Sequence, residues 1–239
     1  MVHTTQKLAF VSFAVLLVLA GCSGIPADDP TTADSNVSVE TLSYPEGWST
    51  DSVDPTVALG THRQTLANLS RQSRVEITDM DGYNRTVRRT VDTQSQTASV
   101  RFLDSSFGTD VESYYTADST YEYDHTTEEV TTTRDTSWNT SDVGFQASNT
   151  IVRPLRNLDV VATESLRVAG DSAINYSVQG IADNSRTPPN AATGYIIVTE
   201  RGYIAEFDIT KSNDDFTRRT RYQLSDVGTA TVSQPSWVE

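Results

Sequence analysis

The stretch that most constrains this chain is Leu-Ala-Gly-Cys at residues 19–22, which ends an apolar run and contains the only cysteine. Residues 8–19 are apolar apart from Ser12. This run is shorter than the roughly 20 apolar residues of a membrane-spanning helix. It has the length of the hydrophobic core of a secretory signal, which ends in small residues at the cleavage site. With one cysteine there is no intrachain disulfide, so an exported domain must be stabilised by packing alone.

The motif at residues 19–22 resembles the lipobox of prokaryotic lipoproteins. The resemblance implies that residues 1–21 are a signal peptide, that Cys22 carries a lipid, and that the protein is anchored in the cell membrane facing outside. One saturated chain anchors a protein only marginally, whereas two anchor it well, so we expect a lipid with two chains. The alternative is a retained N-terminal helix with a chance cysteine.

The acidic balance of the chain restricts its partners. Asp and Glu number 32 against 18 Lys and Arg, which gives a formal net charge of −14. Nucleic acid is excluded as a partner because phosphate binding depends on clustered Lys and Arg. Lysine occurs only as Lys7 and Lys211. An acidic, threonine-rich chain with little lysine is typical of exported proteins of halophiles, since molar salt screens the self-repulsion. An ordinary acidic secreted protein is the alternative.

Residues 22–52 are predicted to be a flexible tether that carries the lipidated Cys22, and residues 53–239 a single domain. The first part of the tether is rich in Pro, Asp and Thr and poor in large apolar residues. Its end, Tyr-Pro-Glu-Gly-Trp at residues 44–48, is unusual because two aromatic residues flank a proline and a glycine. We favour a strap that packs on the domain over a pair of ligand-binding aromatic residues, because a buried Trp is usually a packing element.

A first helix is predicted to begin at Asp54-Pro55, since Asp is a favourable N-cap and Pro suits the first helical position. It is expected to end around residues 70–73. Gly60 weakens it but would allow a close approach to a sheet. Its apolar face contains four residues at helical spacing: Leu59, His62, Leu66 and Leu69.

A second helical pattern starts near Asp142. Its apolar positions extend from Phe145 to Leu158 and include Ile151 and Leu155. Pro154 lies inside the pattern, and we expect a break or kink there because proline removes a helical hydrogen bond.

The remaining segments have the period-two alternation and the turn residues of strands. Hairpin turns are expected at Asp81-Gly82, 104–106, 117–119, 200–202 and 213–215. The fold class is therefore α+β, mainly β: a curved antiparallel meander sheet, a half-barrel of roughly ten strands, covered by two helices. The predicted strands are 75–80, 83–91, 98–102, 113–116, 120–123, 130–134, 165–168, 174–178, 194–199, 203–210 and 217–224, with a short piece at 229–232.

This order of elements resembles the half-barrel family of outer-membrane lipoprotein carriers and mycobacterial glycolipid-binding lipoproteins. The closing hairpin, residues 195–207, matches that scheme, and the segments at Cys22, 44–48 and 56–68 resemble haloarchaeal lipoproteins of unassigned function. The resemblance implies an apolar cavity between sheet and helices. Its predicted lining is Leu59, Leu66, Leu69, Ile151 and Leu155.

No set of residues in the sequence predicts an enzyme, a metal site or a cofactor. There is no Gly-x-Ser-x-Gly motif, and His62 and His125 have no third ligand at zinc spacing. His62 is expected to be a core or boundary residue, and His125 to lie at a strand end or turn. Asp79 and Asp81-Gly82 resemble half of a calcium loop, but a hairpin turn explains them.

Arg218, Arg219 and Arg221 lie in one predicted strand, where Arg219 and Arg221 would share a face and Arg218 would point to the other. They would either pair with acidic neighbours, the interpretation we favour, or receive an anionic head group. Two functions remain open. The first is a membrane-anchored protein that binds or carries an apolar ligand, a lipid or a lipidated protein. The second is a ligand-free structural or protein-interaction module of the cell envelope whose protein partner is unknown.

Overall fold

The computed structural model describes residues 31–33, 43–134, 136, 138, 148–182 and 189–238. The predicted signal peptide and Cys22 lie outside these residues. Within the described part, no helix is both long enough and apolar enough to cross a membrane.

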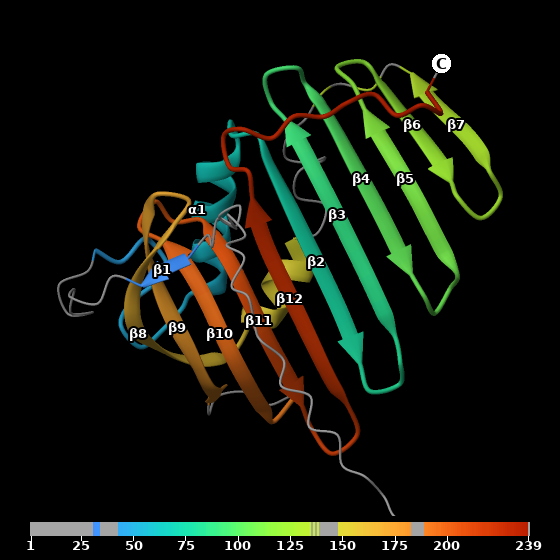
Figure 1. Ribbon diagram of the computed structural model, residues 1–239. Helices are drawn as coiled ribbons and strands as arrows, with labels where there is room; N and C mark the ends of the chain where they lie inside the picture. Colours follow the sequence, from blue (N-terminus) through green and yellow to red (C-terminus); the bar gives the residue numbers. More distant parts are fainter. Residues whose placement is uncertain are drawn as a thin grey trace, which may run out of the picture.

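The structure confirms the predicted fold class: an unclosed, curved antiparallel sheet with two helices among the described residues (Figure 1). The sheet has twelve strands in the order β1-β8-β9-β10-β11-β12-β2-β3-β4-β5-β6-β7. Their bounds are β1 Thr31–Ala33, β2 Arg71–Asp79, β3 Asn84–Asp92, β4 Thr97–Asp104, β5 Thr109–Tyr115, β6 Ser119–Asp124, β7 Glu129–Arg134, β8 Leu158–Val168, β9 Asp171–Ile181, β10 Ala191–Thr199, β11 Ile204–Ser212 and β12 Thr217–Ser225.

Two meanders make up this sheet, apart from β1, which pairs with β8 at one edge. Strands β2 to β7 form one and β8 to β12 the other, and they join where β12 pairs with β2. At that joint Tyr222 lies opposite Val75, and Thr220 lies opposite Ile77. Because side chains alternate across a strand, these four residues point to one face of the sheet, which we call the inner face.

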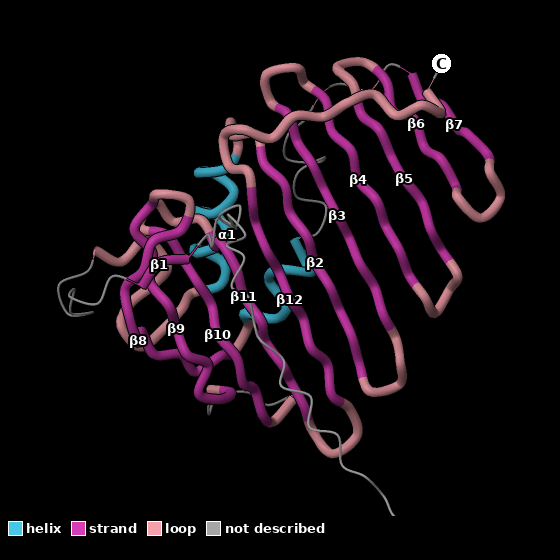
Figure 2. Tube along the Cα trace, in the orientation of Figure 1, coloured by secondary structure: helices cyan, strands magenta, loops and turns pink. Residues whose placement is uncertain are grey.

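Both helices, α1 (Pro55–Leu66) and α3 (Ser148–Leu155), lie on the inner face and contact each other (Figure 2). Helix α1 begins as predicted, because an Asp54 side-chain oxygen accepts hydrogen bonds from the backbone N–H groups of Thr56 and Val57. It ends at Leu66, earlier than predicted, because the guanidinium of Arg71 binds the carbonyls of Leu66 and Leu69 and the chain turns into β2.

The second helix is shorter than its sequence pattern predicted. Phe145 lies outside the described residues, α3 ends at Leu155, directly after Pro154, and Leu158 begins β8 instead of continuing the helix. The break at Pro154 is thus found in the last helical turn. Proline disfavours a helical conformation in the residue before it, which favours an end at this point.

Residues 44–48 form the predicted strap. Trp48 is buried and its ring centroid lies 4.9 Å from that of Tyr176. Gly47 has φ +88°, and a Cβ there would meet the backbone N of Ala58 at 2.4 Å. The close approach of helix α1 therefore occurs at Gly47 and not at Gly60, which is exposed and faces open space.

The boundary between tether and domain also shifts. Residues 43–52, assigned to the tether from composition, belong to the folded domain, because Asp54 N–H donates to Gly47 O and Ala162 N–H donates to Thr50 O. Residues 31–33 form β1, which pairs with the edge of β8. At the other end, residues 229–232 form no strand. Residues 226–238, which we call the tail, cross the sheet toward β6 (Figure 1).

One main core fills the space between the helices and strands β8 to β12, β2 and β3. Its most deeply buried members include Tyr176, Phe207, Ile196 and Leu66, each with at most 1% of its surface exposed. Strands β4 to β7, which we call the wing, extend beyond the helices, and only Ala98, Asp104 and Tyr114 are buried there. The sheet therefore has a covered half and a sparsely covered half.

Candidate ligand-binding cavity

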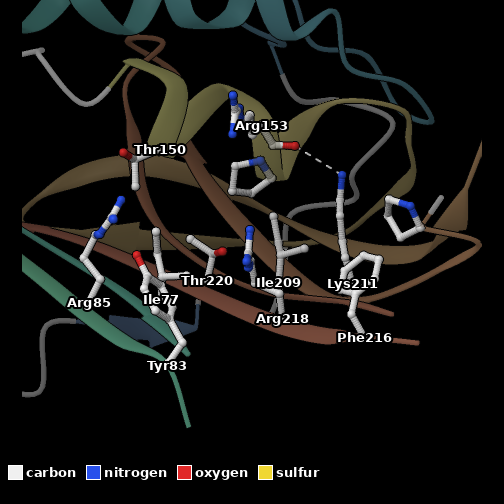
Figure 3. Close-up of a pocket in the computed structure, with 12 residues that line it drawn as sticks. Ile77, Tyr83, Arg85, Thr150, Arg153, Ile209, Lys211, Phe216, Arg218 and Thr220 are labelled. Carbon is white, nitrogen blue, oxygen red and sulfur yellow. Dashed lines mark hydrogen bonds between the residues drawn. The ribbon is translucent and has the colours of Figure 1, made fainter. Parts of the chain in front are cut away.

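A cavity of about 290 Å³ lies between helix α3 and the inner face of the sheet (Figure 3). Helix α3 forms its roof, and strands β11, β12, β2 and β3 form its floor. It is lined by Ile77, Tyr83, Arg85, Thr150, Arg153, Pro154, Pro189, Ile209, Lys211, Phe216, Arg218 and Thr220.

The floor follows from strand register. Ile209 lies opposite Thr220, Thr220 opposite Ile77, and Ile77 opposite Arg85. These four residues therefore form one row across four neighbouring strands on the inner face. The row is apolar at Ile209 and Ile77 and becomes charged at Arg85. An apolar group could pack on its first part, with a cation at the far end.

A second row, one pleat further along the strands, is charged. Lys211 of β11 lies opposite Arg218 of β12, and Arg218 lies opposite Asp79 of β2. The Arg218 guanidinium is 3.4 Å from the Asp79 carboxylate. Across this row one carboxylate faces two cations.

Lys211 caps the C-terminal end of helix α3. Its Nζ donates hydrogen bonds to the carbonyl oxygens of Arg156 at 2.7 Å and of Arg153 at 3.3 Å; the bond to Arg153 is drawn in Figure 3. A cation at a helix C-terminus also interacts favourably with the helix dipole. Burial lowers the pKa of Lys211 to about 8. No carboxylate of the described residues lies within ion-pair distance of it.

Arg85 is held at the other end of the cavity. Its guanidinium binds the buried carboxylate of Asp104 at 2.8 and 3.1 Å and lies 5.3 Å from the Tyr83 ring centroid. Burial acts to raise the pKa of Asp104, but hydrogen bonds from Arg85, the Ser106 backbone N–H and Tyr83 outweigh it, so this pKa lies below its usual range. Arg85 thus faces the cavity already neutralised by one carboxylate.

The five residues predicted to line a cavity lie elsewhere. Leu59, Leu66, Ile151 and Leu155 are buried in the main core, and Leu69 packs against it. None of the five lines the cavity described above, and a ligand contact for them stays a prediction. Within helix α3, Ile151 and Leu155 face the core, whereas Thr150 and Arg153 line the cavity.

His62 is a core residue, as expected. It is fully buried, and its Nδ1 accepts a hydrogen bond from the backbone N–H of Ile204 at 3.0 Å. Burial, with smaller contributions from the charges of Arg71 and Arg63, lowers the pKa of His62 to about 3. The ring is therefore neutral at ordinary pH and supports the helix–sheet contact.

The other candidate polar residues, His125 and Asp79, make contacts within the sheet and its turns. His125 follows β6 and lies 3.2 Å from Glu112. Asp79 accepts a hydrogen bond from Tyr83 N–H in the hairpin turn that contains Gly82, at φ +78°. In the part of the chain that the structure describes, no three His, Cys, Asp or Glu residues are grouped so that they could hold a metal ion.

The strand β12 arginines form ion pairs, as predicted. Arg219 and Arg221 share the outer face and both bind Asp208, while Arg218 points to the inner face. Sequence reasoning did not connect Arg218 to a cavity, nor did it select Arg153 or Lys211. The available signal was Lys211 itself, the only lysine after Lys7, in alternation with Phe207 and Ile209.

Comparison with protein-family models gives no match, and no curated protein sequence matches either. Solved structures do. LprF from Mycobacterium bovis has a TM-score of 0.40 and 11% identity over 79% of this chain and 99% of that one. An uncharacterised conserved protein from Thermus thermophilus has 0.31 and 12%, over 70% and 85%. A LolA superfamily protein from Nitrosomonas europaea has 0.27 and 6%, over 76% and 96%. Likenesses this distant do not identify a ligand.

Proposed function

We propose that this chain is a membrane-anchored, extracytoplasmic binding protein that holds an apolar molecule, a lipid or the lipid part of a lipidated protein, in the cavity under helix α3. The observation that carries this proposal is the cavity itself, roofed by Pro154 and floored by Ile77 and Ile209. Its volume of about 290 Å³ is near the lower end of the range for small-molecule sites. It suits a short apolar segment better than several complete acyl chains.

Anchoring is the second part of the proposal and rests on Cys22 at the end of the apolar run. Cys22→Ser removes the thiol that would carry the lipid. The variant is expected to leave the membrane fraction and appear in the soluble extracellular fraction of its own host. A variant that stays in the membrane fraction would contradict lipid anchoring through this residue.

Ligand binding is tested by native mass spectrometry of the protein, purified in mild detergent from its own host, followed by organic extraction. A co-purifying lipid or isoprenoid that rebinds to the stripped protein would support the proposal. Thr150→Trp should reduce rebinding because the indole would occupy the cavity. Thr56→Trp, a matched change at an exposed position of α1, should leave rebinding unchanged.

Absence of a co-purifying lipid and of rebinding would favour the second candidate function, a ligand-free envelope module. The specific observation behind that alternative is the main core, in which the large residues between the helices and β8 to β12 are packed together. A protein that is empty as purified and takes up no added lipid would replace the binding proposal with this one.

A further inference from the structure

The cavity under α3 gathers positive charge in an acidic protein. Of the described residues that line it, four are cations, Arg85, Arg153, Lys211 and Arg218, and none is a carboxylate, although the chain has a formal net charge of −14. Ordinary surface composition would place more acids than bases around a cavity of this protein. The lining therefore requires a physical explanation.

Only part of this charge is neutralised. Asp104 pairs with Arg85, and Asp79 lies 3.4 Å from Arg218. Among the described residues, no carboxylate forms an ion pair with Arg153 or Lys211. The Lys211 ammonium has three N–H donors, and two of them bind the carbonyls at the end of α3.

The placement of these cations is unfavourable by itself. Lys211 and Arg218 are directly opposite on neighbouring antiparallel strands, and like charges in that position destabilise a sheet. On the outer face, by contrast, the neighbouring cations Arg219 and Arg221 are neutralised, because both bind the carboxylate of Asp208. Among the described residues, none provides such a carboxylate for Lys211 at the inner row, so an anion from outside would relieve the repulsion.

We propose, on the basis of the apolar-ligand function above, that the ligand carries an anionic group, a phosphate, sulfate or carboxylate, that binds among Lys211, Arg153 and Arg218. The apolar part of the ligand then packs on Ile77, Ile209 and Phe216, which line the same cavity. Charge-assisted hydrogen bonds to such oxygens are stronger than neutral ones. The burial that lowers the pKa of Lys211 to about 8 would be opposed by an anion in contact with the ammonium.

The test measures binding of three probes to the intact protein by isothermal titration calorimetry at constant salt: decyl phosphate, decanol and inorganic phosphate. Decyl phosphate has both parts of the proposed ligand, and each other probe has one. Decyl phosphate is expected to bind at least about ten-fold more tightly than either of the others, the effect of one good charged contact.

The other outcomes would overturn either the anionic group, the apolar-ligand function or both. If decanol binds as tightly as decyl phosphate, the anionic group is wrong and the apolar-ligand function stands. If inorganic phosphate binds as tightly as decyl phosphate, the cations bind free anions and the apolar-ligand function is wrong. If no probe binds, both proposals are overturned.

Variants assign the effect to residues. Arg153→Gln removes an exposed cation from the lining and should weaken decyl phosphate binding about three- to ten-fold, with decanol binding unchanged. Arg88→Gln is the matched control, because Arg88 is exposed on β3 and does not line the cavity; it makes the same change in net charge and should leave binding unchanged. If both variants lose decyl phosphate affinity equally, the effect comes from long-range electrostatics, and the assignment of the anion site to Arg153 is wrong.

Discussion

The two halves of the sheet are built from the same antiparallel pairing but are stabilised differently. In the covered half, β9 and β11 each place a row of apolar side chains against the helices, and Tyr176, Phe207 and Ile209 are almost completely buried. In the wing, every residue of β7 is exposed. Antiparallel pairing is therefore common to both halves, whereas the burial of side chains differs sharply between them.

Two other kinds of contact support the wing. The Arg101 guanidinium binds Asp110 through two hydrogen bonds across β4 and β5. The tail adds a second contact on the outer face, where Trp237 stacks on Tyr123 with ring centroids 5.5 Å apart. Regions with few buried apolar contacts open locally at a lower free energy than the core, so the wing is expected to be the less stable half.

The largest difference between the halves should appear on removing one apolar side chain from each. Leu66→Ala empties a fully buried position and should lower the free energy of unfolding by about 2–5 kcal/mol. Val130→Ala changes an exposed residue of β7 and should cost less than about 0.5 kcal/mol. Urea unfolding measures both. Similar losses would mean that the wing packs as well as the core.

Acid should destabilise the covered half through His62. Its pKa is about 3 when folded, against 6.5 for the free side chain, so the unfolded chain binds a proton that the folded one does not. Stability should therefore fall as pH drops from 6.5 toward 3, by up to about 1.4 kcal/mol per pH unit.

Between about pH 6 and 4.5 most carboxylates remain ionised, so the effect of His62 can be measured there. Urea unfolding across that window should show this slope in the wild type and a shallower one in His62→Asn. Equal slopes would exclude His62 as its source.

The tail should stabilise the wing alone. Trp237→Ala removes the stacking on Tyr123 and should cost about 1 kcal/mol. Amide hydrogen exchange should become faster in β5 and β6 and stay unchanged in β9 to β11. Trp48→Ala, the matched change in the core, should cost about 3–5 kcal/mol and speed exchange throughout the covered half. If Trp237→Ala instead speeds amide exchange throughout the sheet, the two halves open as one cooperative unit and this prediction is wrong.

The smallest effect is expected from a surface ion pair of the wing. Arg101 and Asp110 are partly exposed, and such pairs contribute about 0–1 kcal/mol. Arg101→Gln should therefore lower stability by about 0.5 kcal/mol in dilute buffer, and by less in molar salt, where the Debye length is about 3 Å. A loss above about 2 kcal/mol that persists in molar salt would show that the pair is a main support of the wing.

Much of the fold could be predicted because its signals are local. Asp54 and Pro55 marked the start of α1, and Asp81-Gly82 marked the β2–β3 turn, since caps and turns depend on a few neighbouring residues. Boundaries set by distant partners could not be predicted. Leu158 continues a helical pattern in sequence, yet it begins β8, because Leu158 pairs with Ile181 of β9.

The sequence by itself determined the single cysteine, the acidic charge and the α+β sheet with two helices, and it predicts an export signal, because these features depend on composition and short-range periodicity. Only the tertiary structure decided which residues meet in the cavity. Lys211, Arg218 and Arg153 belong to β11, β12 and α3, and strand register together with the position of α3 brings them to one place. That register depends on pairing between segments far apart in the chain, so no local pattern could have revealed it.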